Sequence, residues 1–138
     1  MSRPDIQARL ELSLRYERRA LDYQANSAEL LRRGELAKAG EMLWGAFVSY
    51  LNAVAVLLRG EPLRGHGEVR KLGRQVAIAR GDRELHEYIT TAEAMHANFY
   101  HEFMGKEEFM EYYGRALRAL ASLRQTFIEL REAILSQA

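Results

Sequence analysis

The chain has 138 residues, a formal net charge of +1, 48% hydrophobic residues and 28% charged residues. This balance predicts one globular domain over residues 1–138 and excludes a strongly basic surface that coats nucleic acid. The absence of cysteine excludes disulfides, thiolate metal sites and cysteine nucleophiles. The N-terminus lacks an apolar signal core, and the uncharged run Leu43–Leu58 is shorter than the roughly 20 residues of a membrane span, so we expect a cytoplasmic protein without membrane contact.

The first two predicted elements are long helices. The first is expected to begin near Ser2, to carry Pro4 in its first turn and to end at Gly34. Its expected inward stripe consists of Leu10, Leu14, Leu21 and Ala28. The second runs from Leu36 to a stop at Gly60, and its apolar residues cover most of its circumference, which predicts a helix packed on several sides.

Three further helices are predicted after the "GEPLRGHG" loop. The third spans about 67–80, and the fourth begins after the cap Asp82 and is broken by Gly105. The expected inward residues of the fourth are Leu85, Ile89, Ala92, Met95 or His96, Phe99 and Phe103. Those of the fifth are Phe109, Tyr113, Ala116, Leu120, Leu123, Phe127, Leu130 and Ile134. Helical periodicity without strand signals predicts an all-α, antiparallel bundle of about five helices.

The stretch "AEAMHANFYHEF", residues 92–103, concentrates two of the four histidines. On a helix most of it faces the core, with His96 as an embedded polar group that needs a tyrosine or carboxylate partner. Glu93, His96 and Tyr100 are therefore candidates for a polar core or cavity, whereas Asn98, His101 and Glu102 are expected on the solvent side or at an interface. Glu93 and His96 form a single Glu-x-x-His pair where a di-iron bundle needs two, so no metal is predicted.

The segment 59–83 holds seven basic residues against three acidic ones. Arg70 and Arg74 are neighbours on one helix face, and "RGHG" precedes a first turn whose backbone N–H groups attract anions. Arg64, His66, Arg70 and Arg74 are therefore candidates for binding a nucleotide or an RNA backbone. The alternative is a solvated helix face whose cations pair with the acidic residues of 106–111.

The segments "GELAKAGEMLWGAFVSYLNAVAVLLRGEPLRGHGEV" and "AEAMHANFYHEF" carry a family resemblance that covers most of residues 34–130. The chain resembles the archaeal PaREP family, which is itself similar to HEPN helical bundles. The resemblance implies an up-and-down, often dimeric bundle that binds a nucleotide, RNA or a partner protein. It also implies a nucleotidyltransferase partner or a toxin–antitoxin setting. Met42 and Asn52 stand where that family carries lysines, which argues against a charge-based role there.

Two other functions compete with this non-catalytic, cofactor-free binding role. A HEPN ribonuclease needs an arginine a few residues before a histidine, and Arg59–His66 and Arg80–His86 fit this spacing. Such matches arise by chance in an arginine-rich chain and each spans a helix break, so no catalytic residue is assigned. A tetratricopeptide-like scaffold is the second alternative, but its helix pair is not repeated after 34 residues. Apolar residues on two stripes of the first helix, such as Tyr16 beside Leu14, favour a homodimer.

Overall fold

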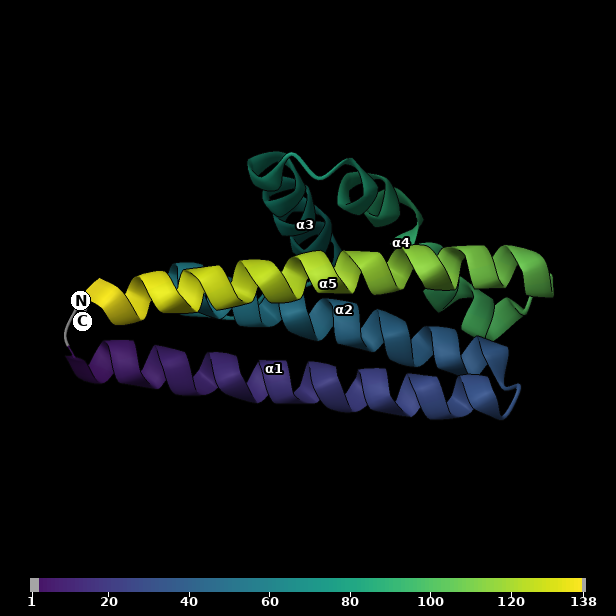
Figure 1. The fold of residues 1–138 in the computed structure, drawn as a ribbon, viewed down its shortest axis with the longest axis horizontal. Coiled ribbons are helices and arrows are strands. Elements are labelled where there is room, and N and C mark those ends of the chain that lie inside the picture. Colours follow the sequence, from purple (N-terminus) through teal and green to yellow (C-terminus); the bar gives the residue numbers. More distant parts are fainter. Residues whose placement is uncertain (1–2, 138) are drawn as a thin grey trace.

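The computed structural model describes the backbone of residues 3–137 and the side chains of residues 5–89, 94–99 and 102–137. The helices are α1 (Arg3–Arg32), α2 (Leu36–Arg59), α3 (His66–Arg80), α4 (Arg83–His101) and α5 (Lys106–Gln137). The prediction of an all-α bundle is confirmed, and the described backbone contains no strand. α1 and α2 are antiparallel; α3 and α4 lie on the far side of α2 from α1, and they return the chain so that α5 runs beside α2 in the same direction (Figure 1).

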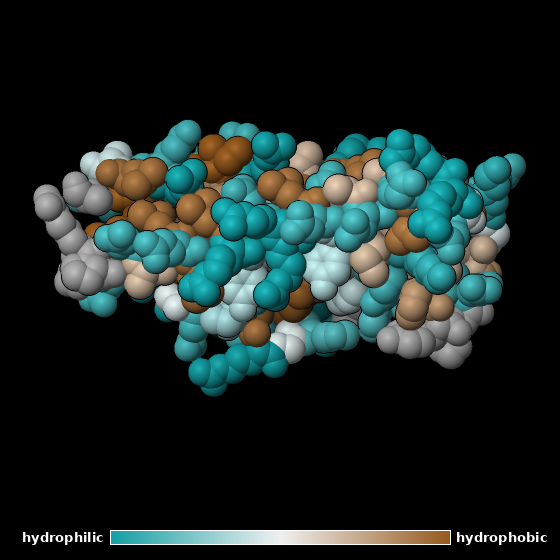
Figure 2. Space-filling view, turned by 90° about the horizontal axis from the view of Figure 1, so that it is seen from below, coloured by the Kyte–Doolittle hydropathy of each residue, from teal (hydrophilic) through white to brown (hydrophobic). Residues whose placement is uncertain are grey.

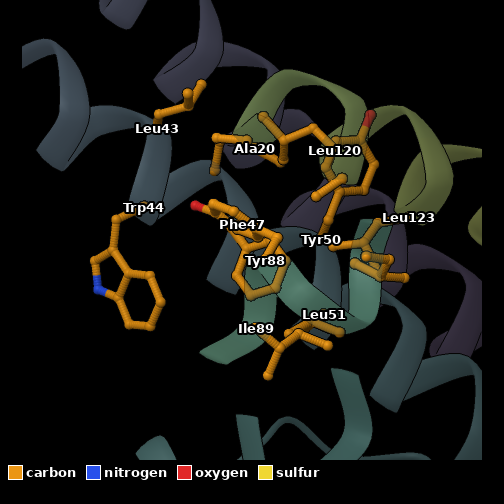
Figure 3. Packing of buried hydrophobic residues seen from close by; sticks show 14 of the residues in the cluster. Ala20, Leu43, Trp44, Phe47, Tyr50, Leu51, Tyr88, Ile89, Leu120 and Leu123 are labelled. Atoms are coloured by element: carbon orange, nitrogen blue, oxygen red, sulfur yellow. The ribbon is translucent and has the colours of Figure 1, made fainter. Parts of the chain in front are cut away.

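Helix α2 is the centre of the bundle, since it contacts all four of the other helices. Phe47, Tyr50 and Leu51 are buried and face different neighbours, so the predicted all-round packing of this helix is confirmed. Figure 3 shows Tyr50 beside Leu120 and Leu123 of α5, and Phe47 and Leu51 beside Tyr88 and Ile89 of α4, with Trp44 at the margin of the cluster. By length and composition α2 is able to cross a membrane, but most of its apolar span is buried inside the bundle, as in the core helix of a soluble protein.

The face that α1 presents to α2 differs from the predicted stripe. Ser13, Ala20 and Ser27 are fully buried, whereas Leu21 is 41% exposed and Ala28 is also exposed. The prediction that Leu21 and Ala28 point inward is therefore wrong. Small side chains allow the two helix backbones to approach closely, and the serine hydroxyls tolerate burial because each donates to a backbone carbonyl, at 2.7 and 2.6 Å respectively.

Helix α4 begins at the predicted cap. One carboxylate oxygen of Asp82 accepts a hydrogen bond from the backbone N–H of Leu85 at 3.0 Å, and the other accepts one from the hydroxyl of Ser122 on α5. Burial acts to raise the pKa of the Asp82 carboxyl, but these hydrogen bonds outweigh it and hold the pKa below its usual value. The cap therefore also ties the start of α4 to α5.

The end of α4 was predicted incorrectly. The helix ends at His101 rather than at Gly105, and Glu102 takes the left-handed conformation with φ of 46°. Phe103 consequently lies beyond the helix and is 56% exposed, not inward. Asn98, expected on the solvent side or at an interface, is only 3% exposed, and its side-chain oxygen accepts the backbone N–H of Met104 at 3.0 Å, which closes the turn.

Candidate functional site

A cluster of polar and aromatic side chains lies where α2, α3 and α4 converge. The rings of His66, at the start of α3, and His96, on α4, have centroids 6.0 Å apart. Each ring centroid lies 5.7 Å from that of Trp44 on α2, and the carboxylate of Glu41, one turn earlier on α2, reaches His96. We call Glu41, Trp44, His66 and His96 the two-histidine cluster. Sequence analysis had assigned its two histidines to separate sites.

Within the cluster, Glu41 fixes the orientation of His96. Both carboxylate oxygens lie near the Nδ1 atom of the imidazole, at 2.8 and 3.0 Å. The His96 side chain is 31% exposed, so it is half-buried rather than a core residue. The predicted carboxylate partner is thus present, and it comes from α2. A carboxylate at Nδ1 holds the imidazole ring in place.

The loop between α2 and α3 positions the ring of His66 against the ring of Trp44. Gly60 ends α2 in the left-handed conformation, and the side-chain oxygen of Asn52 accepts the backbone N–H of Leu63 at 2.7 Å. Arg59 donates to the carbonyl of Pro62 at 3.0 Å, which closes the turn. These hydrogen bonds therefore hold the start of α3 against α2.

Glu68 joins both sides of this loop. Its carboxylate accepts hydrogen bonds from the guanidinium of Arg59 at 2.6 Å and from the backbone N–H of Arg64 at 3.2 Å. The Arg59 hydrogen bond is the main reason why the pKa of Glu68 lies below its usual value. Arg59 is thus engaged by Glu68 and Pro62, which gives it a structural role in place of the one that the ribonuclease motif assigns to it.

The other basic residues of segment 59–83 line the outside of α3 and its preceding loop. Arg74 is exposed, Arg70 is half-buried, and the exposed Arg64 lies 3.5 Å from Glu61. Arg80 reaches across to Glu129 of α5 at 2.9 Å. Arg59, Arg64 and Arg80 therefore pair with Glu68, Glu61 and Glu129, and not with residues 106–111 as the alternative interpretation expected.

Glu93 and Tyr100 of the predicted polar cavity lie outside the described side chains, and so does His101, which was predicted elsewhere. Among the described residues, no group of three or more potential ligands is arranged to hold a metal ion. Sequence analysis missed Glu41 and Trp44 as partners of the histidines. Their spacing of three residues on a helix places them on one face, which is a signal, but nothing in the sequence says that α4 lies against that face.

The fold and the two-histidine cluster together define a small all-α protein with a polar site between three helices and a basic helix beside it. The sequence profile of the archaeal PaREP1/PaREP8 family matches residues 8–120, which include all of α2, α3 and α4. The chain belongs to this family. No curated protein and no solved structure matches the chain.

Proposed function

We propose that this protein binds a phosphate-bearing ligand, a nucleotide or RNA, at the two-histidine cluster, as a non-catalytic HEPN-like domain. The observation that carries the proposal is the meeting of His66 and His96 over Trp44 at the start of the basic helix α3. The resemblance to HEPN-like proteins suggested a ligand of this kind, and the cluster supplies a place for it.

The chemistry of the site suits a phosphate group. The first backbone N–H groups of a helix have no intrahelical partner and carry a partial positive charge, and His66 is the first residue of α3. Imidazoles donate hydrogen bonds to phosphate oxygens, more strongly when they are protonated. Arg64 precedes His66 by two residues and Arg70 follows it by one helical turn, so both add positive charge on the approach to the cluster.

The only tryptophan of the chain, Trp44, lies inside the proposed site and makes a direct measurement possible. Titration of the protein with ATP or with a short single-stranded RNA at low salt is expected to change the Trp44 fluorescence. His66→Ala combined with His96→Ala should weaken the affinity at least tenfold, about 1.4 kcal/mol. Arg70→Ala combined with Arg74→Ala should weaken RNA binding and reduce its dependence on salt.

Two control variants match these changes in chemistry. His86→Ala removes an exposed histidine of α4 that lines a separate hollow with Gly81 and Asp82, and Arg32→Ala removes an exposed arginine outside the basic segment. Both should bind like the unchanged protein. Equal affinity of the double-histidine variant and the His86 control would refute the proposal, as would the absence of any fluorescence change at low salt.

RNA cleavage is a second candidate function, and the pairing of two imidazoles favours it. One imidazole can accept a proton from an attacking hydroxyl while the other donates one to the leaving oxygen. Glu41 would hold His96 in the orientation for such a role. Cleavage of a labelled RNA that disappears in both His66→Ala and His96→Ala, while His86→Ala stays active, would replace the binding proposal by this one.

A homodimer through the groove between α1 and α5 is the second part of the proposal. This groove of about 310 Å³ includes Gln24 of α1 and Tyr50 of α2, and the Tyr50 hydroxyl is buried without a hydrogen-bond partner among the described residues. Burial raises the Tyr50 pKa, which Glu17 of α1 also raises and Arg124 of α5 lowers, so the two charges border the hydroxyl. A twofold axis would set α1 of one copy against α5 of the other and place Glu17 opposite Arg124.

Exposed apolar residues on the two helices beside this groove support the same arrangement. Leu117 of α5, which lines the groove, is 39% exposed, and Leu21, one turn before Gln24 on α1, is 41% exposed. Figure 2 shows a separate gathering of hydrophobic residues, toward the end of the molecule that holds both termini. Light scattering at micromolar concentration is expected to give the mass of a dimer, and Leu21→Glu with Leu117→Glu should give that of a monomer. A monomer mass for the unchanged protein would contradict the dimer.

A further inference from the structure

A second cavity, of about 410 Å³, lies at the opposite end of the bundle from the termini, where α1 turns into α2 and α4 turns into α5. The turn between α1 and α2 forms one wall, residues 34–38. Asn98, Glu102, Met104 and Phe109 form the other. The volume is within the range of small-molecule sites in proteins, roughly 300–1,000 Å³. Its walls combine backbone N–H donors without intrahelical partners, carboxylates and apolar surface.

The donors come from the first turn of α2. The backbone N–H of Ala39 is the first in this helix to reach a carbonyl, that of Glu35 at 3.0 Å, which leaves the N–H groups of Leu36, Ala37 and Lys38 without intrahelical partners. Glu35 stands at the cap position but makes no capping hydrogen bond, because its carboxylate is turned to Lys38 at 3.2 Å. These three N–H groups are therefore available to a ligand in the cavity.

Asn98 is evidence for a ligand in the cavity that is independent of the N–H groups of α2. The residue is 97% buried, and its side-chain oxygen is committed to the backbone N–H of Met104. This hydrogen bond assigns the other atom as the amide nitrogen, and that nitrogen donates to no acceptor among the described residues. Asn98 nevertheless lines the cavity, so a nearly buried donor is available to whatever occupies it.

Glu102 supplies an acceptor from a strained position. It is the only residue other than glycine with positive φ in the described backbone, and glycines take the other four such positions. Glutamate is disfavoured there, since its Cβ crowds the following carbonyl. Its carboxylate is exposed at the cavity and makes no ion pair among the described residues. A strained residue with an unused charge at a cavity points to a role for that charge.

The charges disfavour a simple anion and favour a zwitterion. Lys38 and Arg33 both pair with Glu35, at 3.2 and 3.6 Å, which leaves the carboxylate of Glu102 as the unpaired charge in the lining of the cavity, and this carboxylate would repel a phosphate despite the helix end. We infer that the cavity binds a free α-amino acid with an apolar side chain. Its carboxylate meets the open N–H groups of α2 and the Asn98 amide, and its ammonium group meets Glu102. Its side chain packs against Met104 and Phe109.

Titration of the ¹⁵N-labelled full chain with L-leucine or L-methionine, followed by NMR, tests this assignment. The backbone amides of Leu36, Ala37 and Lys38 and the side-chain amide of Asn98 are expected to shift. N-acetyl-L-leucine lacks the ammonium group and L-leucinamide lacks the carboxylate, so each should bind at least tenfold more weakly. Unshifted amides at millimolar leucine, or equal binding of either derivative, would overturn the inference.

Substitution of Glu102 separates binding from folding. Glu102→Gly relieves the left-handed strain, so the melting temperature should be unchanged or higher, while leucine binding falls at least tenfold. Glu102→Gln keeps the shape and should lose the same affinity, whereas Glu108→Gln, an exposed carboxylate of α5 outside the cavity, should lose none. Full affinity in Glu102→Gly would refute the role of its carboxylate. The inference is independent of phosphate binding, because His66→Ala with His96→Ala should leave these amide shifts in place.

Discussion

Phe47→Ala is expected to lower the free energy of unfolding by about 3–5 kcal/mol, the usual range for removing a buried phenylalanine. Phe47 is almost fully buried in α2 and packs edge-on against Tyr88 of α4, with ring centroids 5.0 Å apart. It also stacks against Trp44, 6.1 Å away. The truncation therefore opens a cavity at the joint between α2 and α4. Because small domains are stable by only about 5–15 kcal/mol, this loss is a large share of the total.

Urea denaturation followed by circular dichroism measures this loss, and Phe103→Ala is the matched control. Phe103 is 56% exposed beyond the end of α4, so its removal should change the free energy of unfolding by no more than about 0.5 kcal/mol. The helical pattern of the sequence assigned Phe103 to the core. Similar losses from the two variants would show that Phe103 is buried after all and that α4 continues to Gly105.

Ser27→Leu is expected to lower the free energy of unfolding by about 2–6 kcal/mol, the sum of a lost hydrogen-bonded group and an overpacked interface. Ser27 joins three helices: its hydroxyl donates to the carbonyl of Ala39 on α2 at 2.6 Å and lies 2.9 Å from the hydroxyl of Tyr113 on α5. The hydroxyl of Ser27 has one proton, which it donates to the carbonyl of Ala39. The hydroxyl of Tyr113 must therefore donate its own proton to the oxygen of Ser27. Leucine would both fill this narrow space and leave the buried Tyr113 hydroxyl without its acceptor.

Leu21→Ser tests the same interface from the opposite direction. Leu21 belongs to the stripe that the sequence predicted to face inward, but it is 41% exposed. Its replacement should change the free energy of unfolding of a single copy by about 0.5 kcal/mol or less, apart from any loss at the proposed dimer interface. Thermal melts of the two variants decide which stripe of α1 faces α2. A stable Ser27→Leu together with an unstable Leu21→Ser would mean that the predicted stripe is the correct one.

The two-histidine cluster shows why part of the candidate site was within reach of sequence analysis and part was not. His66 was recognised beside the basic helix, and His96 was recognised as a polar group that needs a carboxylate. Both conclusions follow from local spacing. That the carboxylate is Glu41, and that the two histidines meet over Trp44, depends on how α3 and α4 cross α2. Residues of three different helices, between 22 and 55 positions apart, are brought together there, and no local pattern encodes that crossing.

By itself the sequence determined that this protein is all-α and where most of its helices begin and end, because periodic apolar residues, glycine stops and an aspartate cap act within a few residues of one another. Only the tertiary structure decided that Ser27 faces inward in place of Leu21, and that Asn98 is buried while Phe103 is not. The physical reason is that a buried polar group is stabilised by partners from distant segments. Ser27 finds a carbonyl of α2, and Asn98 finds the N–H of a turn, which makes their burial more favourable than polarity alone predicts.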